Sequence, residues 1–298
     1  MEIRRVAVIG SGQMGTGMAQ VTARAGIDTV LMKMTEGPVE AGKQKIAKAL
    51  QRDVEKQRMT QEDLDGTLGR LSCTNKIHDL AECDLIIESV IEDLEEKRRL
   101  FARLEDVVNE KAIFASNTST LSITALAEAT KRPTRVIGLH FFNPAPLMKL
   151  VEIVPTLRTD PEVVRVAQDF TAKVKKTGVT IRDFTGFVVN RLLTPYMVDA
   201  MRTVQEGLAS IAAIDSAMQL GANHPMGPLA LADFIGLDIV FHMSNNLYEE
   251  YREARFTPPP LLRRLVLAGF LGRKSGKGFY DYSTTPPTAN DFLVSSVA

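Results

Sequence analysis

Short apolar runs alternate with amphipathic stretches up to about residue 184. The runs are rich in β-branched residues and stop at glycine or polar residues, which is typical of buried strands. In chain order they read RRVAVIG, TVLMKM, DLIIESV, AIFASN, RVIGLHF, LVEIVP and GVTIRDF. Helical stretches over 39–58, 95–109 and 121–130 separate them. Because strand and helix alternate, the pattern predicts an α/β fold with a doubly wound, mostly parallel sheet.

Local signals indicate where some helices begin and end. The helix that follows RRVAVIG should end at Gly26, because glycine readily adopts the left-handed conformation at a helix C-terminus. Thr60, followed by Asp63, should cap a short helix after the long charged one.

The pattern changes after DFTGFVVNRLL. Residues 187–270 carry helical periodicity and no clear strand, which predicts an all-α second domain. Within it, 228–251 reads as one apolar helix, and the TPPP segment at 257–260 should break the helices. The end of the chain is polar and contains proline, so we expect disorder there. The predicted domains are 1–185, 186–283 and a tail over 284–298.

Composition narrows the class of protein. Of 298 residues, 45% are apolar and 24% charged, which is ordinary for a globular protein. Lysine plus arginine equals aspartate plus glutamate, at 36 each, so the basic excess of a nucleic-acid binder is missing. Cys73 and Cys83, the two cysteines, form no metal-ligand or disulfide pattern, which favours a reducing compartment.

The N-terminus and the hydropathy predict a cytoplasmic location. MEIRRVAVIG runs straight into a strand and leaves no room for a signal peptide. No apolar run approaches the ~20 residues that cross a membrane. We therefore expect a cytoplasmic protein with neither membrane nor nucleic-acid partners.

Candidate chemistry begins at GSGQMG, a G-x-G-x-x-G pattern formed by Gly10, Gly12 and Gly15. A strand ends just before it and a helix opens within it. In that context the first glycine makes the turn, the second admits a pyrophosphate and the third lets helix and strand pack closely. The helix N-terminus then attracts the phosphate charge. The pattern predicts a dinucleotide cofactor.

The second strand, TVLMKM, leaves the choice between NAD and NADP open. An acid usually stands near its end and accepts the ribose hydroxyls of NAD, but here the residue is Lys33. A lysine removes the repulsion toward a 2′-phosphate and supplies a cation. The alternative is a solvated Lys33 with NAD bound through its other groups, and we favour NAD slightly because arginine suits phosphate better.

Polar residues follow the next two strands, where a ligand crevice is expected. DLIIESV, taken as the third strand, ends at Glu88 and is followed by Glu92 and Lys97. A solvated helix start would explain the latter two equally well. The loop SNTST after AIFA suits a substrate, but Ser119 or Thr120 could instead cap a helix.

A histidine and a glutamate form the strongest catalytic candidate. His140 ends the strand RVIGL, where it can take a proton from an alcohol near neutral pH. Glu152 lies in the apolar run LVEIVP, where a carboxylate needs a partner and could orient the imidazole. The alternatives are a core histidine and an edge-strand glutamate. Asn190, after the domain change, can reach the crevice or simply face solvent.

Four cations recur at three- and four-residue spacing on one face of the long charged helix: Lys45, Lys48, Arg52 and Lys56. A phosphate-rich ligand could use this stripe, although a solvated helix face is the simpler interpretation.

At this point the chain resembles 3-hydroxyacyl-CoA dehydrogenases. The motifs that carry the resemblance occur in order and are long: VAVIGSGQMGTGMAQ, ASNTSTLSIT, GLHFFNPAPLMKLVEIV, DFTGFVVNRLL, GANHPMGPLALADFIGLD and GRKSGKGFYDY. They span residues 3 to about 282, and the likeness is greatest to the short bacterial 3-hydroxybutyryl-CoA dehydrogenases. Lys33 departs from the family pattern, in which most members carry an acid.

The resemblance implies a Rossmann-type domain, a helical domain that forms a homodimer, and an acyl-CoA substrate. It implies that His140 is the base, Glu152 its partner, and Ser119 and Asn190 the contacts to the substrate oxygen. The implied cofactor contacts are Gly10, Gly12, Gly15, Glu92, Lys97, Asn143 and Lys274, and the implied CoA contacts are Arg52 and Lys56.

The reaction expected is hydride transfer between a nicotinamide and C3 of (S)-3-hydroxyacyl-CoA, which gives 3-oxoacyl-CoA. Two alternatives stay open from the sequence. The first is a dehydrogenase of a free hydroxy acid, like the gulonate dehydrogenases similar to lens λ-crystallin. The second is a non-catalytic nucleotide-binding protein on the same fold.

Overall fold

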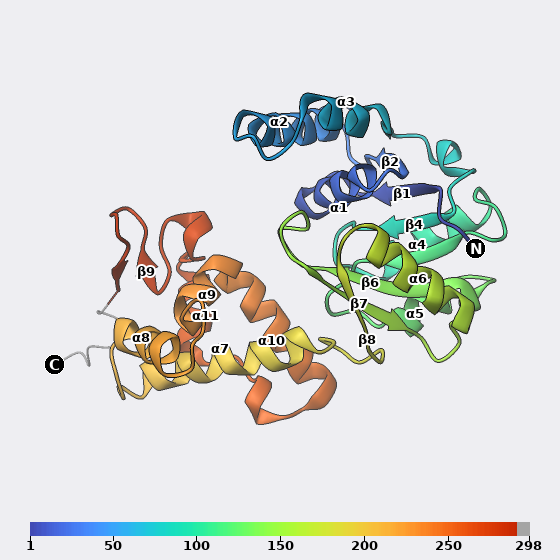
Figure 1. Cartoon of the computed structure of the whole chain (residues 1–298). Helices are drawn as coiled ribbons and strands as arrows, with labels where there is room; N and C mark the ends of the chain where they lie inside the picture. Colours follow the sequence, from blue (N-terminus) through green and yellow to red (C-terminus); the bar gives the residue numbers. More distant parts are fainter. Residues whose placement is uncertain (291–298) are drawn as a thin grey trace. The chain divides into compact units, whose positions relative to one another are not determined.

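The computed structural model describes residues 1–290 and divides into unit 1, Met1–Phe184, and unit 2, which begins at Thr185 (Figure 1). An eight-stranded sheet organises unit 1. Its strands are β1 (Arg5–Ile9), β2 (Asp28–Met32), β3 (Leu71–Thr74), β4 (Leu85–Glu88), β5 (Ile113–Ser116), β6 (Val136–Phe141), β7 (Leu150–Pro155) and β8 (Thr177–Thr180). In space they run β3-β2-β1-β4-β5-β6-β7-β8. The order reverses at β1, so the ligand crevice expected of this topology lies at the carboxyl ends of β1 and β4.

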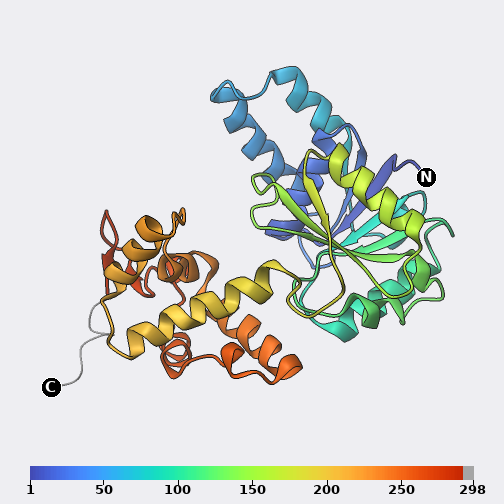
Figure 2. The same ribbon diagram turned by 60° about the horizontal axis from the view of Figure 1, so that its bottom comes forward.

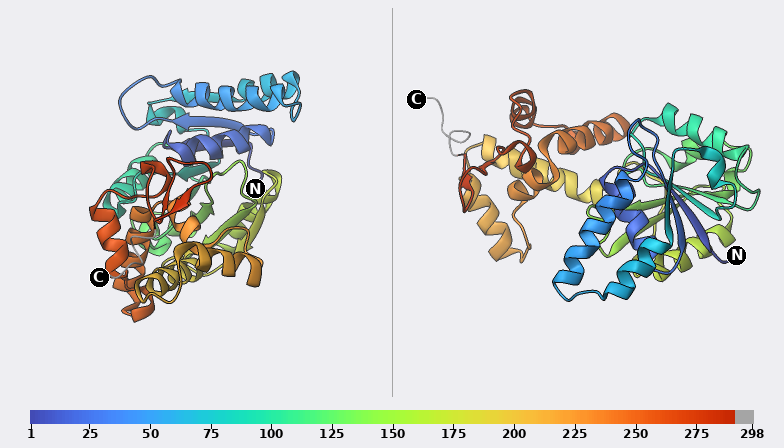
Figure 3. Two further views of the ribbon diagram at one scale, coloured as in Figure 1. Left: turned by 90° about the vertical axis from the view of Figure 1, so that its left-hand side faces the viewer. Right: turned by 90° about the horizontal axis from the view of Figure 1, so that it is seen from above.

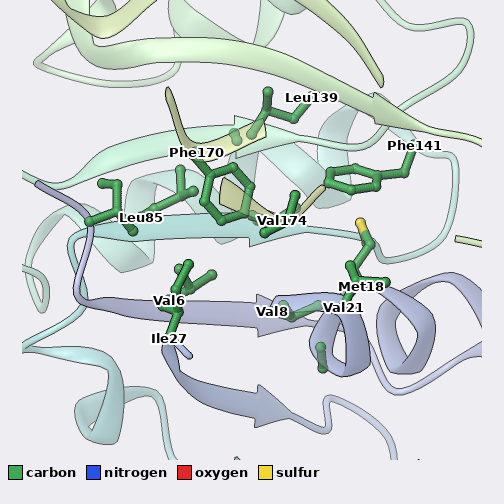
Figure 4. Packing of buried hydrophobic residues seen from close by; sticks show 14 of the residues in the cluster. Val6, Val8, Met18, Val21, Ile27, Leu85, Leu139, Phe141, Phe170 and Val174 are labelled. Atoms are coloured by element: carbon green, nitrogen blue, oxygen red, sulfur yellow. The ribbon is translucent and has the colours of Figure 1, made fainter. Parts of the chain in front are cut away.

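Helices cover both faces of this sheet. They are α1 (Gln13–Arg24), α2 (Ala41–Glu55), α3 (Gln61–Gly69), α4 (Leu94–Glu105), α5 (Ile123–Ala127) and α6 (Pro161–Lys173), with short 3-10 turns η1 (Ile77–Leu80) and η2 (Pro133–Arg135). Figure 2 shows α6, in yellow-green, along one face of the sheet. Side chains from α1 and α6 share one apolar cluster, which includes Met18, Val21, Phe170 and Val174 (Figure 4). Each large side chain buried there contributes roughly 1.5–3 kcal/mol to folding.

Side chains alternate between the two faces of the sheet along each strand, so His140 and Glu152 lie on the face opposite the α1–α6 cluster. Leu139 and Phe141 point into the α1–α6 cluster, so His140 between them points away from it. Val151 and Ile153 likewise belong to that cluster. The intervening glutamate of β7 therefore shares the face of His140.

The predicted mostly parallel, doubly wound sheet is confirmed, with three differences. LSCT forms β3, a strand that the apolar pattern did not predict, so Glu88 ends the fourth strand and not the third. The helix α6 was not predicted either. Finally, β7 runs antiparallel to β6. The helix ends are as expected: Gly26 adopts a φ of +81°, and the Thr60 side chain accepts from the Asp63 amide at 3.1 Å.

Unit 2 is helical through residue 267. Its elements are α7 (Val189–Gln205), α8 (Ile211–Gly221), α9 (Pro228–Ile235), α10 (Leu237–Tyr251), α11 (Pro260–Leu267), the 3-10 turns η3 (Ala254–Phe256) and η4 (Arg273–Ser275), and the short strands β9 (Tyr280–Asp281) and β10 (Thr288–Ala289) (Figure 3). The prediction of one helix over 228–251 is wrong, because the segment forms two helices, α9 and α10. Gly236 has a φ of +109°, which ends α9 and starts α10 in a new direction.

The tail predicted from residue 284 begins with ordered structure. Thr288 pairs with Asp281 and Ala289 with Tyr280 in an antiparallel ladder. The Asn290 amide group is buried and donates to the Gly278 carbonyl oxygen at 2.6 Å. The remaining part of the tail, 291–298, lies outside the described residues.

The motif GRKSGKGFYDY has a structural explanation within unit 2. The buried Asp233 carboxylate accepts from the Phe279 and Tyr280 amides at 3.0 and 2.9 Å and from the Tyr282 hydroxyl at 3.0 Å. A Cβ at Gly278 would lie 2.0 Å from the same carboxylate. Burial raises the pKa of Asp233 to about 6, although these donors oppose the rise. The motif thus wraps around one buried acid.

Among residues 1–290, no helix has both the length and the hydropathy that a bilayer crossing needs.

Candidate active site

The turn between β1 and α1 has the shape that a dinucleotide requires. Gly10 has a φ of +109°, and a Cβ there would lie 2.2 Å from the Ser89 carbonyl oxygen. A Cβ at Gly15 would lie 1.7 Å from the Gly10 carbonyl oxygen. Both positions therefore require glycine, the first for its backbone conformation and the second for close packing.

Gly12 differs from these two glycines because its surroundings are open. Apart from Gly12 itself and its two chain neighbours, no described heavy atom lies within 4 Å of the place where its Cβ would be. Gly12 is also the N-cap of α1, and the first turn of that helix carries no acidic residue. The positive end of the helix dipole thus faces space that a side chain would fill. These residues fit a pyrophosphate.

Lys33 follows β2 at the carboxyl edge of the sheet. Its Nζ donates to the Thr35 hydroxyl at 2.6 Å, and its backbone amide donates to the Thr74 carbonyl at 2.8 Å. The side chain is half-buried. A cation therefore stands at the end of β2, where a dinucleotide-binding domain usually carries a ribose-binding acid.

A buried ion pair lies below the crevice. Lys97 on α4 is 1% exposed, and its Nζ lies 2.6 Å from Glu88 Oε1 and 3.3 Å from Glu92 Oε2. The interpretation of this segment as a solvated helix start is wrong for Lys97. Glu88 is fully buried, and it also accepts from the Val90 amide and the Ser116 hydroxyl, each at 2.7 Å. Lys97, the Val90 amide and the Ser116 hydroxyl thus satisfy the carboxylate that β4 places inside the protein.

Glu92 fastens the SNTST loop. Its Oε1 accepts from the Thr118 hydroxyl at 2.5 Å, the Ser119 amide at 3.0 Å and the Thr120 hydroxyl at 3.1 Å. Burial opposes ionisation of this carboxyl group, but Lys97 and the loop donors outweigh it, so the pKa of Glu92 lies below its ordinary value. The loop is therefore fixed by a charged acceptor.

The helix-cap interpretation of this loop is wrong. Ser122 caps α5, because its hydroxyl oxygen accepts from the Ala125 amide at 3.2 Å. Ser119 and Thr120 lie before the cap. Within residues 1–290 the Ser119 hydroxyl has no hydrogen-bond partner, and the residue is partly exposed. Its oxygen can therefore contact a ligand.

His140 and Glu152 face each other across the β6–β7 ladder. They are directly paired in the antiparallel register, and His140 Nδ1 lies 2.7 Å from Glu152 Oε2. The histidine is 6% exposed and the glutamate 1%. Because a carboxylate accepts, Nδ1 carries the proton and Nε2 is the basic nitrogen. Glu152 is no edge-strand residue, since β8 lies beyond β7.

The segment after β6 brings further polar groups to this edge. The Phe142 ring lies 4.5 Å from the His140 ring, centroid to centroid. Asn143 follows it and is exposed. Asn117, in the SNTST loop, accepts from the Phe141 amide at 2.8 Å and so ties the end of β6 to the loop after β5.

Unit 2 carries two of the predicted site residues. Asn190 lies in the first turn of α7 and is partly exposed. Lys274 lies in η4, and its Nζ is 2.5 Å from Asp238 Oδ1. On the α2 segment of unit 1, the stripe of Lys45, Lys48, Arg52 and Lys56 is exposed throughout.

The sequence placed Ser116, Asn117 and Thr118 in a loop that suits a substrate, but it did not predict that they connect Glu88, Glu92 and β6. A usable signal was present, because these residues and Glu88 stand at the ends of paired strands. The groups at this edge comprise a buried, oriented imidazole, a serine hydroxyl and a helix N-terminus that is open at Gly12. Together they can move a proton to or from a substrate oxygen beside a dinucleotide.

Comparisons with known proteins agree with this chemistry. Residues 5–184 match the family model described as the NAD binding domain of 3-hydroxyacyl-CoA dehydrogenase, and residues 186–282 match its C-terminal domain. The chain is 45% identical over 282 residues to a 3-hydroxybutyryl-CoA dehydrogenase of Mycobacterium tuberculosis, covering 94% of this chain and 99% of the relative. It is 46% identical over 285 residues to a 3-hydroxybutyryl-CoA dehydrogenase of Bradyrhizobium diazoefficiens, covering 96% of this chain and 97% of the relative.

A solved structure gives the same picture. The (S)-3-hydroxybutyryl-CoA dehydrogenase PaaH1 of Ralstonia eutropha superposes with a TM-score of 0.92 at 40% identity, covering 95% of this chain and all of the other.

Proposed function

The chain belongs to the 3-hydroxyacyl-CoA dehydrogenase family, and from this premise we propose that it interconverts (S)-3-hydroxybutyryl-CoA and acetoacetyl-CoA. It is an oxidoreductase that uses a nicotinamide cofactor. The observation that carries the proposal is the buried His140–Glu152 pair at 2.7 Å. A free hydroxy acid such as gulonate is the competing substrate, and saturation with acetoacetyl-CoA but not with gulonate separates the two.

His140 is the proposed acid and base. In the oxidative direction its Nε2 takes the proton of the C3 hydroxyl, while Glu152 holds the ring and stabilises the imidazolium that forms. The bound nicotinamide supplies the acceptor for the hydride from C3. In the reductive direction the imidazolium returns the proton to the oxygen. Ser119, and Asn190 on the family resemblance, hold the substrate oxygen.

The remaining site residues are assigned to the two ligands. Gly10, Gly12 and Gly15 receive the pyrophosphate, and Glu92, whose position Lys97 fixes, contacts the cofactor. Asn143 and Lys274 are assigned to the cofactor by family resemblance only. Arg52 and Lys56 on the exposed α2 stripe are assigned to the phosphates of CoA.

We propose NAD as the preferred cofactor, with discrimination against NADP weakened by Lys33. In Lys33→Asp, kcat/KM with NADPH should fall at least tenfold relative to NADH, because the new carboxylate repels a 2′-phosphate. That ratio corresponds to about 1.4 kcal/mol. Initial rates of acetoacetyl-CoA reduction with each cofactor provide the measurement. An unchanged ratio would mean that Lys33 is solvated and takes no part in cofactor choice.

We also propose a homodimer formed through unit 2. Several large apolar side chains of this unit are exposed, among them Leu220 at 87% and Leu267 at 77%. Light scattering coupled to size exclusion should give twice the chain mass of 32.8 kDa. A monomer at micromolar concentration would contradict this assignment and leave the catalytic proposal in place.

A further inference from the structure

Unit 1 contains a hollow of about 330 Å³ at the opposite end of α1 from the glycine turn. Its walls come from the last turn of α1, the α2–α3 region, the β6–β7 loop and the residues between α6 and β8. Val21 and Val174, two of its lining residues, belong to the apolar cluster in Figure 4. None of the residues assigned to the catalytic site lines it.

The hollow concentrates positive charge in a chain whose net charge is zero. Five basic residues and one acidic residue line it, an excess of four positive charges: Arg24, Arg58, Arg70, Lys175, Lys176 and Asp63. Concave surfaces lined by one sign of charge focus the field and attract counter-ions.

Two of the cations have structural roles. Arg70 Nε donates to the Ala23 carbonyl oxygen at 3.0 Å, near the end of α1. Lys176 Nζ donates to the carbonyl oxygens of Met148 and Pro146 at 2.7 and 3.2 Å, in the loop that joins the His140 and Glu152 strands. Both therefore satisfy backbone acceptors.

The other three cations lack such roles. Within residues 1–290, the side chains of Arg24, Arg58 and Lys175 make no ion pair or hydrogen bond, although all three line one hollow. Asp63 does not pair with them either. Its backbone amide donates to the Thr60 hydroxyl oxygen and its carbonyl oxygen accepts from the Thr67 hydroxyl, while its side chain makes no ion pair or hydrogen bond within the described residues. Burial lowers the pKa of Lys176, and the positive charge of Arg24 adds to this effect.

Helix C-termini offset only part of this charge. The last turns of α1, α2, α3 and α6 all end close to lining residues in sequence, and each carries roughly half a negative charge. Four ends would cancel about two of the four excess positive charges. About two excess positive charges remain, which a multivalent anion would neutralise.

We propose that this hollow binds a diphosphate-type anion at a site separate from the catalytic crevice. Arg24, Arg58 and Lys175 supply the charge-assisted hydrogen bonds. The apolar floor at Val21 and Val174 leaves room for a carbon skeleton attached to the phosphates. The proposal does not rest on the proposed function.

The test is a calorimetric titration of inorganic pyrophosphate into the full-length protein at low salt, with NAD saturating so that the dinucleotide site is filled. Wild-type protein should bind one equivalent. In Arg24→Gln/Lys175→Gln the dissociation constant should rise at least tenfold. The matched control is Arg165→Gln/Lys111→Gln, which removes two exposed charges of unit 1 that do not line the hollow.

Equal binding by the two double variants, or no binding by wild type, would overturn the proposal. Thermal unfolding of each variant establishes that it is folded before titration. Repeating the titration with ADP separates two sources of such an anion. Tighter binding of ADP indicates a nucleotide, and equal binding indicates a small diphosphate, so both results uphold the site.

Discussion

Replacing His140 with alanine should lower kcat for oxidation of (S)-3-hydroxybutyryl-CoA about 10³-fold. A positioned general base typically contributes 10²–10⁴-fold, and the buried Glu152 carboxylate holds His140 Nδ1 at 2.7 Å. The KM for the cofactor should change little, because the glycine turn on α1 is untouched. Steady-state kinetics with both substrates varied provide the measurement.

Glu152→Gln is the matched test of the pair. The amide can still accept from or donate to the ring, but it cannot stabilise the imidazolium. The fall in kcat should therefore be one to two orders of magnitude smaller than the fall caused by His140→Ala. Because the two residues act as a unit, His140→Ala/Glu152→Gln should be no slower than His140→Ala alone. Near wild-type turnover of His140→Ala would remove the assignment of the base.

The sequence predicted that His140 and Glu152 interact, but it did not predict the strand pairing that brings them together. Apolar alternation identifies RVIGLHF and LVEIVP as strands, and a charged residue inside each as a group that needs a partner. The alternation does not indicate that β7 pairs with β6 in the antiparallel direction. That pairing produces the direct His140–Glu152 register, since a parallel partner would have needed a crossover connection.

The sequence prediction failed where contacts between distant segments determine burial or strand formation, because the local pattern of polar and apolar residues does not include those contacts. EDLEEKRR reads as a solvated helix start, yet Lys97 is enclosed because β4 buries Glu88 beneath it. LSCT alternates poorly and only its place beside β2 makes it a strand. Conversely, the glycines of GSGQMG carried enough stereochemical information to be assigned individually, because each has a distinct steric reason.

The prediction with the largest effect on stability concerns this enclosed ion pair. Lys97→Met should lower the free energy of unfolding by about 3–5 kcal/mol, because removing one partner of a buried pair leaves an uncompensated charge. Among the described residues, Glu88 would keep the Val90 amide and the Ser116 hydroxyl as its donors. The chain contains no tryptophan, so urea unfolding is best followed by far-ultraviolet circular dichroism.

The control Glu88→Gln/Lys97→Met shows whether the single variant loses stability because Glu88 is left uncompensated or because the Lys97 side chain no longer fills its place. The oxygen of the new amide can still accept from the Val90 amide, and its NH2 group can donate to the Ser116 hydroxyl oxygen. The double variant should therefore recover most of the stability that the single variant loses. If both variants are equally unstable, the loss comes from the cavity or from Glu92, whose carboxylate Lys97 also contacts at 3.3 Å. Kinetics decide between those two: freeing Glu92 loosens the SNTST loop and raises KM, whereas a cavity beneath α4 leaves the folded active site unchanged.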